Sequence, residues 1–134
     1  MSNNLIMIII IFMMLVFVPT TTVFLIIIFS KKSRERKIKN YTGTAEETIT
    51  NIVKRGIDSP WIIYASYNVD GIHYNIKETA KLKSNIIKVG KIPIGQRKTF
   101  IMGFIKKGNK IKIQYDENNP KKAIIADNNG IITG

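Results

Sequence analysis

The chain has 134 residues, enough for one domain, and contains no cysteine, which excludes a disulfide framework, a thiol nucleophile and a cysteine-ligated zinc site. Its formal net charge of +12 is of the kind found in proteins that bind nucleic acid or anionic membranes. Ile, Lys and Asn, whose codons are all A/T-rich, supply 57 of the 134 residues, so we expect part of the lysine excess to carry no functional meaning.

Residues 5–29 contain no charged side chain over 25 positions, and 18 of them are Leu, Ile, Val or Phe. As a helix this segment reaches about 37 Å, at about 1.5 Å per residue, against a hydrocarbon core of about 30 Å. Pro19 and the three following threonines oppose insertion near the middle, but threonine hydroxyls bond to helix carbonyls and the aliphatic majority prevails. We therefore predict a transmembrane anchor over residues 1–30, in which the Pro-Thr stretch is a kink.

A basic juxtamembrane linker is predicted over residues 31–39, with six cations: Lys31, Lys32, Arg34, Arg36, Lys37 and Lys39. The N-terminal flank carries no charged side chain, and no small-residue cleavage motif follows the apolar stretch, which argues against a cleaved signal peptide. The positive-inside rule then predicts a single-pass protein of the cell membrane with its C-terminal domain in the cytoplasm. The six cations fit headgroup anchoring, and specific recognition of anionic lipid is the alternative that stays open.

Residues 40–134 are predicted to form a β-domain, and their clearest signal is a hairpin. Asp70-Gly71 is typical of a type I′ turn between alternating strands. Closing the hairpin there gives one apolar face, with the pairs Val69 and Ile72, Tyr67 and Tyr74, and Ala65 and Ile76; Trp61 and Ile63 extend this face. The other face is mostly polar, with the pairs Asn68 and His73, Ser66 and Asn75, and Tyr64 and Lys77. This pattern predicts a half-buried antiparallel pair.

Further strands are expected on both sides of this hairpin. Residues 110–115 alternate Ile111, Ile113 and Tyr115 with Lys and Gln, and residues 121–126 are available to pair with them. The stretch 85–104 is less regular, and Pro93 restricts any strand there to an edge or an interruption. Residues 44–55 have a helical capping pattern, but five of the six residues 48–53 are β-branched, which favours a strand.

These segments predict a mainly β protein in which an N-terminal transmembrane helix precedes a small antiparallel β-barrel or sandwich of five or six strands. The stretches "YTGTAEETITNI", "YASYNVDGIHYN" and "KKGNKIKIQYDENNPKKAII" also resemble the bacterial domain-of-unknown-function family numbered thirty-five ninety-two. The resemblance covers most of residues 41–126 and is strongest at Gly108, Tyr115, Asp116, Asn119, Pro120 and Ala123. It implies a single-span protein with a small β-barrel, and it brings no established reaction.

Two positions depart from that family pattern, because Asn109 stands where the family has Asp, and Glu117 stands where it has its first proline. The corner at residues 116–120 is interpreted structurally: Asp and Asn side chains bond to local backbone and Pro120 fixes a bend.

The residue types offer little for catalysis or metal binding. His73 is the single histidine and is expected as a solvated strand residue. Glu46 and Glu47 are neighbours that point to opposite faces if their segment is a strand. The acidic-asparagine corner lacks EF-hand spacing, and no phosphate-binding glycine loop is present. We therefore expect a protein that is not an enzyme, with no catalytic residues, no cofactor and no metal.

Basic residues gather in the second half of the domain, where residues 77–112 contain eleven Lys or Arg and one acid, Glu78. Such a surface fits an anionic leaflet, and we expect a non-catalytic interaction module with membrane lipid and an unidentified protein as partners. The alternative is a membrane-tethered barrel that binds single-stranded nucleic acid. It is disfavoured because Tyr67, Tyr74 and Tyr115 are expected in the core, although Phe100 and Phe104 have no assigned place.

Overall fold

The computed structural model describes residues 2–133 and divides into two compact units, Met1–Arg36 and Lys37–Gly134. The first unit consists of most of helix α1 (Asn3–Asn40). The second contains all the strands that the described residues form: β1 (Gly43–Lys54), β2 (Trp61–Val69), β3 (Ile72–Thr79), β4 (Leu82–Val89), β5 (Ile92–Phe100), β6 (Lys110–Asp116) and β7 (Asn119–Ile125). The mainly β class is confirmed. The described residues form seven strands where five or six were expected, and two of them, β4 and β5, form a ribbon separate from the five-stranded sheet.

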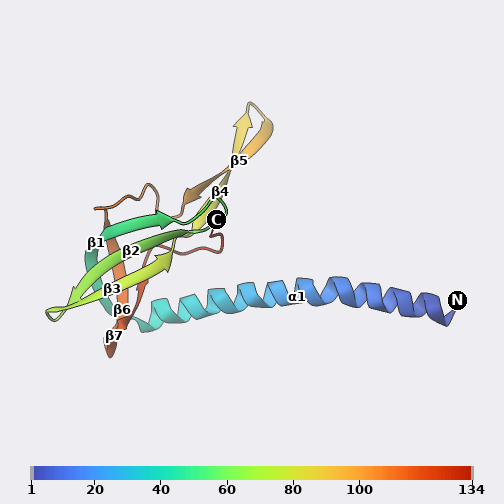
Figure 1. Ribbon diagram of the computed structural model, residues 1–134, viewed down its shortest axis with the longest axis horizontal. Coiled ribbons are helices and arrows are strands. Elements are labelled where there is room, and N and C mark those ends of the chain that lie inside the picture. Colours follow the sequence, from blue (N-terminus) through green and yellow to red (C-terminus); the bar gives the residue numbers. More distant parts are fainter. Residues whose placement is uncertain (1, 134) are drawn as a thin grey trace. The chain divides into compact units, whose positions relative to one another are not determined.

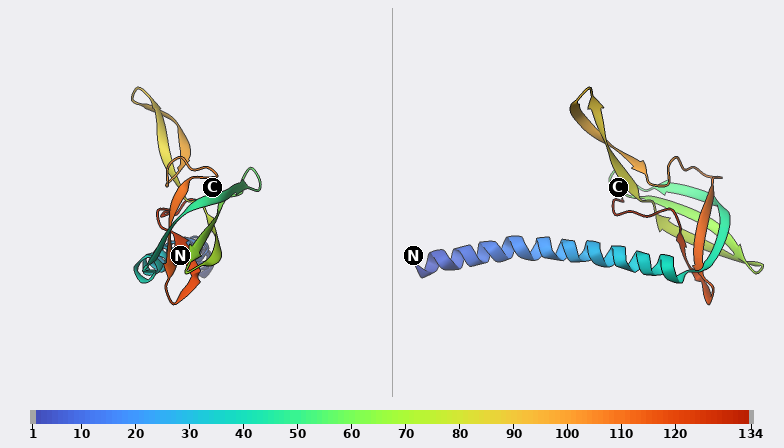
Figure 2. Two further views of the ribbon diagram at one scale, coloured as in Figure 1. Left: turned by 90° about the vertical axis from the view of Figure 1, so that its left-hand side faces the viewer. Right: turned by 180° about the vertical axis from the view of Figure 1, so that it is seen from behind.

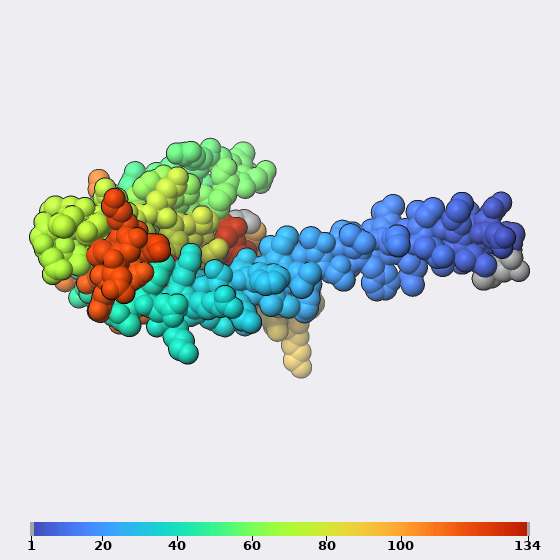
Figure 3. Space-filling model, turned by 90° about the horizontal axis from the view of Figure 1, so that it is seen from below, coloured from blue at the N-terminus to red at the C-terminus, as the bar shows by residue number. Residues whose placement is uncertain are grey.

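Helix α1 is continuous over 38 residues, and none of its residues is buried. The apolar side chains of residues 5–18 and 23–29 are all exposed, and Figure 3 shows one face of this helix in blue. The helix is long and apolar enough to cross a membrane. The segment predicted as a basic linker at residues 31–39 is helical and continues α1 without a break, because it contains no Pro or Gly and its Lys, Arg and Glu are good helix formers.

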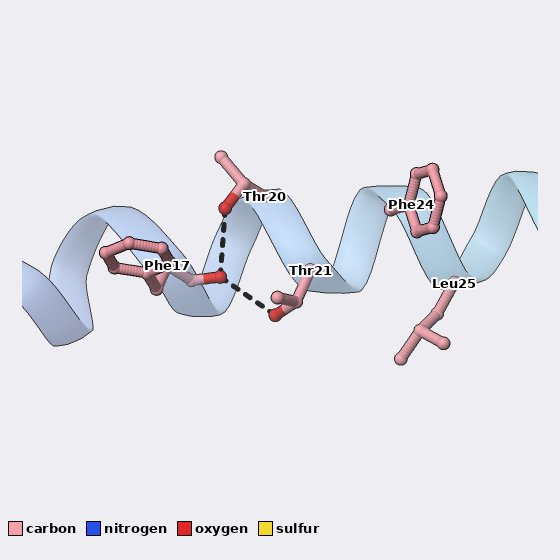
Figure 4. A pocket seen from close by; sticks show the side chains of 5 residues that line it. All are labelled: Phe17, Thr20, Thr21, Phe24 and Leu25. Atoms are coloured by element: carbon pink, nitrogen blue, oxygen red, sulfur yellow. Dashed lines mark hydrogen bonds between the residues drawn. The ribbon is translucent and has the colours of Figure 1, made fainter.

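Pro19 lies inside α1, where it cannot donate the usual backbone hydrogen bond. The hydroxyls that follow it bond back into the helix: Thr20 donates to the carbonyls of Val16 and Phe17, both at 3.0 Å. Thr21 donates to the Phe17 carbonyl at 2.8 Å, so this oxygen accepts from two hydroxyls (Figure 4). The predicted back-bonding is confirmed, and these hydroxyls need no partner outside the helix.

The five-stranded antiparallel sheet has the order β3-β2-β1-β6-β7. It curls until its first and last strands, β3 and β7, lie close together, as the yellow-green and red strands labelled in Figure 1 show. Two side chains bridge the remaining gap. Glu78 of β3 accepts a hydrogen bond from the Ile125 amide of β7 at 2.8 Å, and the Tyr67 hydroxyl of β2 donates to the Pro120 carbonyl. The result is a nearly closed barrel.

The predicted β2–β3 hairpin is confirmed residue by residue, from Val69 opposite Ile72 to Tyr64 opposite Lys77. Asp70 and Gly71 have φ of 52° and 81°, the pair of positive values that a type I′ turn needs. On the apolar face Ile63, Ala65, Tyr67 and Ile76 are buried in the barrel. The alternation therefore assigned this face correctly except beside the turn, where Ile72 is 57% exposed.

Residues 44–54 form strand rather than helix, as the β-branched residues favoured, and Arg55 follows the end of β1. Strand β1 pairs with β6 through its first half and with β2 through its second, and a bulge lies between Ile49 and Asn51. The bulge lets one long strand bend into both parts of the barrel wall. The capping pattern did not produce a helix because both edges of this segment are paired in the sheet.

The core combines aliphatic residues from β1, β2, β3, β6 and β7 with a stack of tyrosines. Tyr67 stacks on Tyr74 and on Tyr115, with ring centroids 5.5 and 6.2 Å apart. Tyr115 also covers Gly43, where an added Cβ would lie 2.3 Å from its ring. The core position predicted for the three tyrosines is confirmed, with Tyr67 fully buried and the other two partly buried.

Candidate functional site

The β4–β5 hairpin is the most distinctive surface feature of the β-domain. It belongs to no larger sheet, and it projects from the barrel as the yellow and gold ribbon of Figures 1 and 2. Every residue from 83 to 98 is exposed. The gold atoms of its tip also stand out in the space-filling view of Figure 3.

Residues 86–94, called the tip here, carry a group of aliphatic side chains in water. Their exposed fractions range from 38% to 68%, and they are Ile86, Ile87, Val89, Ile92 and Ile94. From the pairing of Val89 with Ile92, and from alternation along β4, Ile87, Val89 and Ile92 lie on one face of the ribbon. Grouped exposed aliphatic residues are costly in water, and patches of this kind are typical of contact sites for proteins, membranes or ligands.

The turn and a bulge shape this tip. Gly90 has φ of 61° and is followed by Lys91, which has no positive φ, a combination typical of a type II′ hairpin turn. The register shifts between Ile87 and Lys88, so that Ile94 is the extra residue opposite them. Pro93 lies beside this bulge, in a ribbon whose two strands are both edges, as its missing amide requires.

The stem of the hairpin, residues 82–85 and 95–100, differs from its tip in chemistry. Polar side chains join the two strands: Ser84 contacts Gln96 at 3.2 Å, and the Asn85 amide donates to the Thr99 hydroxyl at 2.9 Å. All charged side chains on the two strands and their turn are cations: Lys83, Arg97 and Lys98 on the stem, and Lys88 and Lys91 within the tip. The hairpin therefore presents an aliphatic end on a polar, positively charged support.

The base of the hairpin is fixed to the barrel by a buried asparagine. Asn128 has no exposed surface; its Oδ1 accepts from the Lys81 amide at 2.7 Å, and its Nδ2 donates to Glu78 at 2.7 Å and to the Thr79 carbonyl at 2.8 Å. The Leu82 amide also donates to the Ile132 carbonyl at 2.8 Å. These bonds connect the end of β3, the start of β4 and the chain after β7.

An open pocket of about 500 Å³ lies where the hairpin meets β1 and β2, and it is lined by Lys54, Ile57, Asp58, Trp61, Leu82, Lys98, Thr99 and Phe100. The Trp61 and Phe100 rings pack edge to face with centroids 5.7 Å apart, and the Lys54 ammonium lies 5.7 Å from the Trp61 ring. Phe100 thus has a place against Trp61, whereas Phe104 is 88% exposed.

A second hollow lies on the surface of α1, beside Phe17, Thr20, Thr21, Phe24 and Leu25 (Figure 4). One helix supplies all of its lining, so it has no opposite wall. Because the nearby hydroxyls are bonded to helix carbonyls, the hollow offers an apolar surface and no convergent polar groups. It has none of the features of a ligand site.

The residues considered for chemistry stay apart. His73 is exposed on β3 opposite Asn68. Glu46 is exposed opposite Lys112, while its neighbour Glu47 is partly buried opposite Ile111. Within residues 2–133, no three His, Asp or Glu side chains come together as metal ligands would.

The corner between β6 and β7 has the predicted local bonding, because Asp116 Oδ1 accepts from the Asn118 amide at 3.0 Å. Its Pro120 is the second residue of β7, and the Pro120 carbonyl accepts from Tyr67. The corner therefore helps to close the barrel. Burial raises the pKa of the Tyr67 hydroxyl above its ordinary value of 10.0, and the nearby Tyr74 and Tyr115 raise it further.

Sequence reasoning missed the tip and Asn128. The tip had a usable signal: the aliphatic residues of 86–94 fall on both faces of the ribbon, because Ile86 and Ile87 are neighbours on one strand, whereas a half-buried strand keeps its aliphatic residues on one face. The sequence gives no signal for Asn128, because its three hydrogen-bond partners are 47 to 50 residues away along the chain.

No family model, no curated protein and no solved structure matches the chain. The resemblance of residues 41–126 to the family numbered thirty-five ninety-two therefore stays a prediction, and function is argued from the geometry alone.

Proposed function

We propose that this is a single-pass membrane protein whose α1 crosses the bilayer and whose β-domain is a non-catalytic interaction module that binds through the β4–β5 hairpin. The proposal rests on the observation that the molecule has two exposed apolar surfaces. One is a helix of membrane-spanning length with no buried residue. The other is the aliphatic tip of a hairpin that projects from a well-packed barrel.

The charges support the orientation proposed for the anchor. The uncharged apolar stretch ends at Phe29, and six cations with a single acid, Glu35, follow within the same helix. Lys and Arg on this side keep the following domain in the cytoplasm, and they place cations at the level of the anionic headgroups.

The buried side chains of the β-domain are all used in packing the barrel, which supports an interaction role carried by exposed residues. Its buried side chains are aliphatic residues, Tyr67 and Asn128, and both polar ones have hydrogen-bond partners in the barrel. A binding surface is instead supplied by the tip, whose side chains have no packing role in the domain.

The experiment combines extraction with topology. We expect the full chain to stay in the membrane fraction after an alkaline wash, and a reporter that works only in the cytoplasm to be active when fused after residue 134. Release by the wash would contradict the anchor, and activity of an exclusively extracytoplasmic reporter would contradict the orientation. Replacing the six cations of residues 31–39 by glutamine should reduce the topological bias without releasing the chain.

A membrane-tethered nucleic-acid-binding barrel is the second candidate, and one observation favours it. The pocket at the hairpin base brings Trp61 and Phe100 together with Lys54 and Lys98, and base stacking beside cations is how proteins hold single strands. The two rings pack against each other, which leaves less ring surface for a base. Binding of a single-stranded oligonucleotide that is lost in Phe100→Ala, with unchanged thermal stability, would establish this candidate.

A further inference from the structure

We propose that the tip of the β4–β5 hairpin inserts into the surface of an anionic lipid bilayer, with Ile87, Val89 and Ile92 among the acyl chains and the cations of the hairpin at the headgroups. This inference rests on the proposed function and names the partner of its interaction element. The observation that carries it is the chemistry along the ribbon: the exposed aliphatic residues gather at the tip, with Lys88 and Lys91 between them, and the stem is cationic and hydrogen-bonded.

The aliphatic end selects lipid among anionic partners. Single-stranded nucleic acid is held by stacking of bases on aromatic rings, and residues 86–94 contain no aromatic residue. Ile and Val side chains instead gain free energy when they leave water for hydrocarbon, and they gain it without any directional contact. The acyl-chain region of a bilayer can remove all of these side chains from water at once.

The charge of the hairpin selects an anionic surface and disfavours a second copy of the chain. Five cations and no acid lie on β4, β5 and their turn. Two hairpins laid together would bring like charges face to face, which is destabilising. Anionic lipid attracts each of these cations at short range, and the attraction is screened by salt.

Local geometry allows the tip to enter a bilayer while its cations stay in the headgroups. Lys88 pairs with Pro93 and falls on the face opposite Val89 and Ile92. Its long stem, like that of Lys91 at the turn, reaches back toward the headgroups from a shallow position. The two-residue turn leaves few unpaired backbone groups at the apex. The outer edges of both strands pair with no other strand, so entry is confined to the bilayer interface, where headgroups and water bond to these backbone groups.

The absence of cysteine from the chain gives a clean experiment. We would place a single polarity-sensitive fluorophore at Val89→Cys in the full chain, reconstituted into vesicles of phosphatidylcholine with or without phosphatidylglycerol. A matched label at His73→Cys, exposed on β3 of the other hairpin, serves as the control. Both positions are on the surface, so neither label disturbs the core.

The expected result is specific to the tip. In vesicles with phosphatidylglycerol, the Val89 label should shift its emission to the blue and be quenched by spin-labelled acyl chains, and added salt should reduce both effects. The His73 label should do neither. Adding Ile92→Ser and Ile94→Ser should lower the inserted fraction on the order of tenfold. The matched change of Ile57 and Phe104, also exposed but outside the hairpin, should leave it unchanged.

Other outcomes overturn the inference. Equal emission in both kinds of vesicle would show that the tip stays in water. A blue shift that depends on the protein-to-lipid ratio would assign the tip to a second copy, and a shift on adding an oligonucleotide without phosphatidylglycerol would assign it to nucleic acid. Flotation of the vesicles after an alkaline wash separates the two proposals: if the chain floats with an unquenched label, only the inserting tip is wrong, and if it does not float, the anchor is wrong.

Discussion

The two hairpins β2–β3 and β4–β5 begin from similar local chemistry and end in opposite environments. Each has a two-residue turn with glycine at positive φ, at Gly71 and at Gly90, and each has β-branched residues in its strands. β2 pairs with β1 along its other edge, so its apolar face is covered by the barrel. Apart from one isolated bridge between Leu82 and Ile132, the described parts of β4 and β5 pair only with each other. The comparison shows that burial of a hairpin is decided by the strands beside it.

The largest expected effect contrasts a buried and an exposed isoleucine in the two hairpins. Ile63 of β2 has 0% exposure and Ile92 of β5 has 68%. Ile63→Ala should lower the free energy of unfolding by about 2–5 kcal/mol, because it leaves a cavity in a packed core. Ile92→Ala should change it by no more than about 0.5 kcal/mol. Denaturant unfolding of both variants tests this, and equal losses would show that the β4–β5 ribbon packs on the domain.

Asn128 tests what attaches the projecting hairpin to the barrel. Asn128→Ala removes the partner of the Lys81 amide, and we expect a loss of about 1–3 kcal/mol because a buried donor is left unsatisfied. The exposed neighbour Asn129 is the matched control, and Asn129→Ala should cost less. Thermal unfolding gives the measurement, and a stable Asn128→Ala variant would mean that water replaces the side chain.

Substitution of the two turn glycines sharpens the comparison further. Gly71→Val should destabilise the domain by about 1–3 kcal/mol, because a β-branched residue resists positive φ. Gly90→Val has a similar local cost, but it falls on a ribbon that carries no core residue beyond Leu82 and the partly buried Phe100. We expect its melting temperature to stay closer to that of the parent chain. An unchanged melting temperature for Gly71→Val would contradict the observed turn.

The smallest effect concerns the hydroxyl that helps to close the barrel. Tyr67→Phe removes the hydrogen bond to the Pro120 carbonyl and should cost about 0.5–1.5 kcal/mol near neutral pH. Tyr64→Phe, on the outer face of β2, is the control and should cost less.

The raised pKa of Tyr67 adds a pH dependence with a defined sign. The unfolded chain ionises this hydroxyl above about pH 10 while the folded chain does not. Its contribution to stability is therefore fully present below pH 10 and is lost as the pH rises toward the folded pKa. Unfolding curves at alkaline pH should show a steeper loss in the parent chain than in Tyr67→Phe. Parallel losses would show that Tyr67 does not titrate differently in the two states.

The sequence predicted more of the fold than of the candidate site. The apolar helix, strand β1, the full β2–β3 register and the inward face of β6 follow from the pattern of side chains in short windows, and the structure confirms them. The ribbon of β4 and β5 was expected only as irregular strand at an edge. Its separation from the sheet was not expected, because alternation cannot reveal that a strand has no neighbour on its outer side.

By itself the sequence determined three features that depend on neighbours along the chain: the long apolar helix, the cations that end it, and the turn at Asp70-Gly71. The tertiary structure alone decided which apolar residues are covered. Val69 and Val89 both precede a two-residue turn in a β-strand, yet Val69 packs against the core and Val89 is 64% exposed. The physical reason is that burial requires atoms from distant strands, such as β1 beside β2, and the order in which strands pair is a property of the closed barrel as a whole.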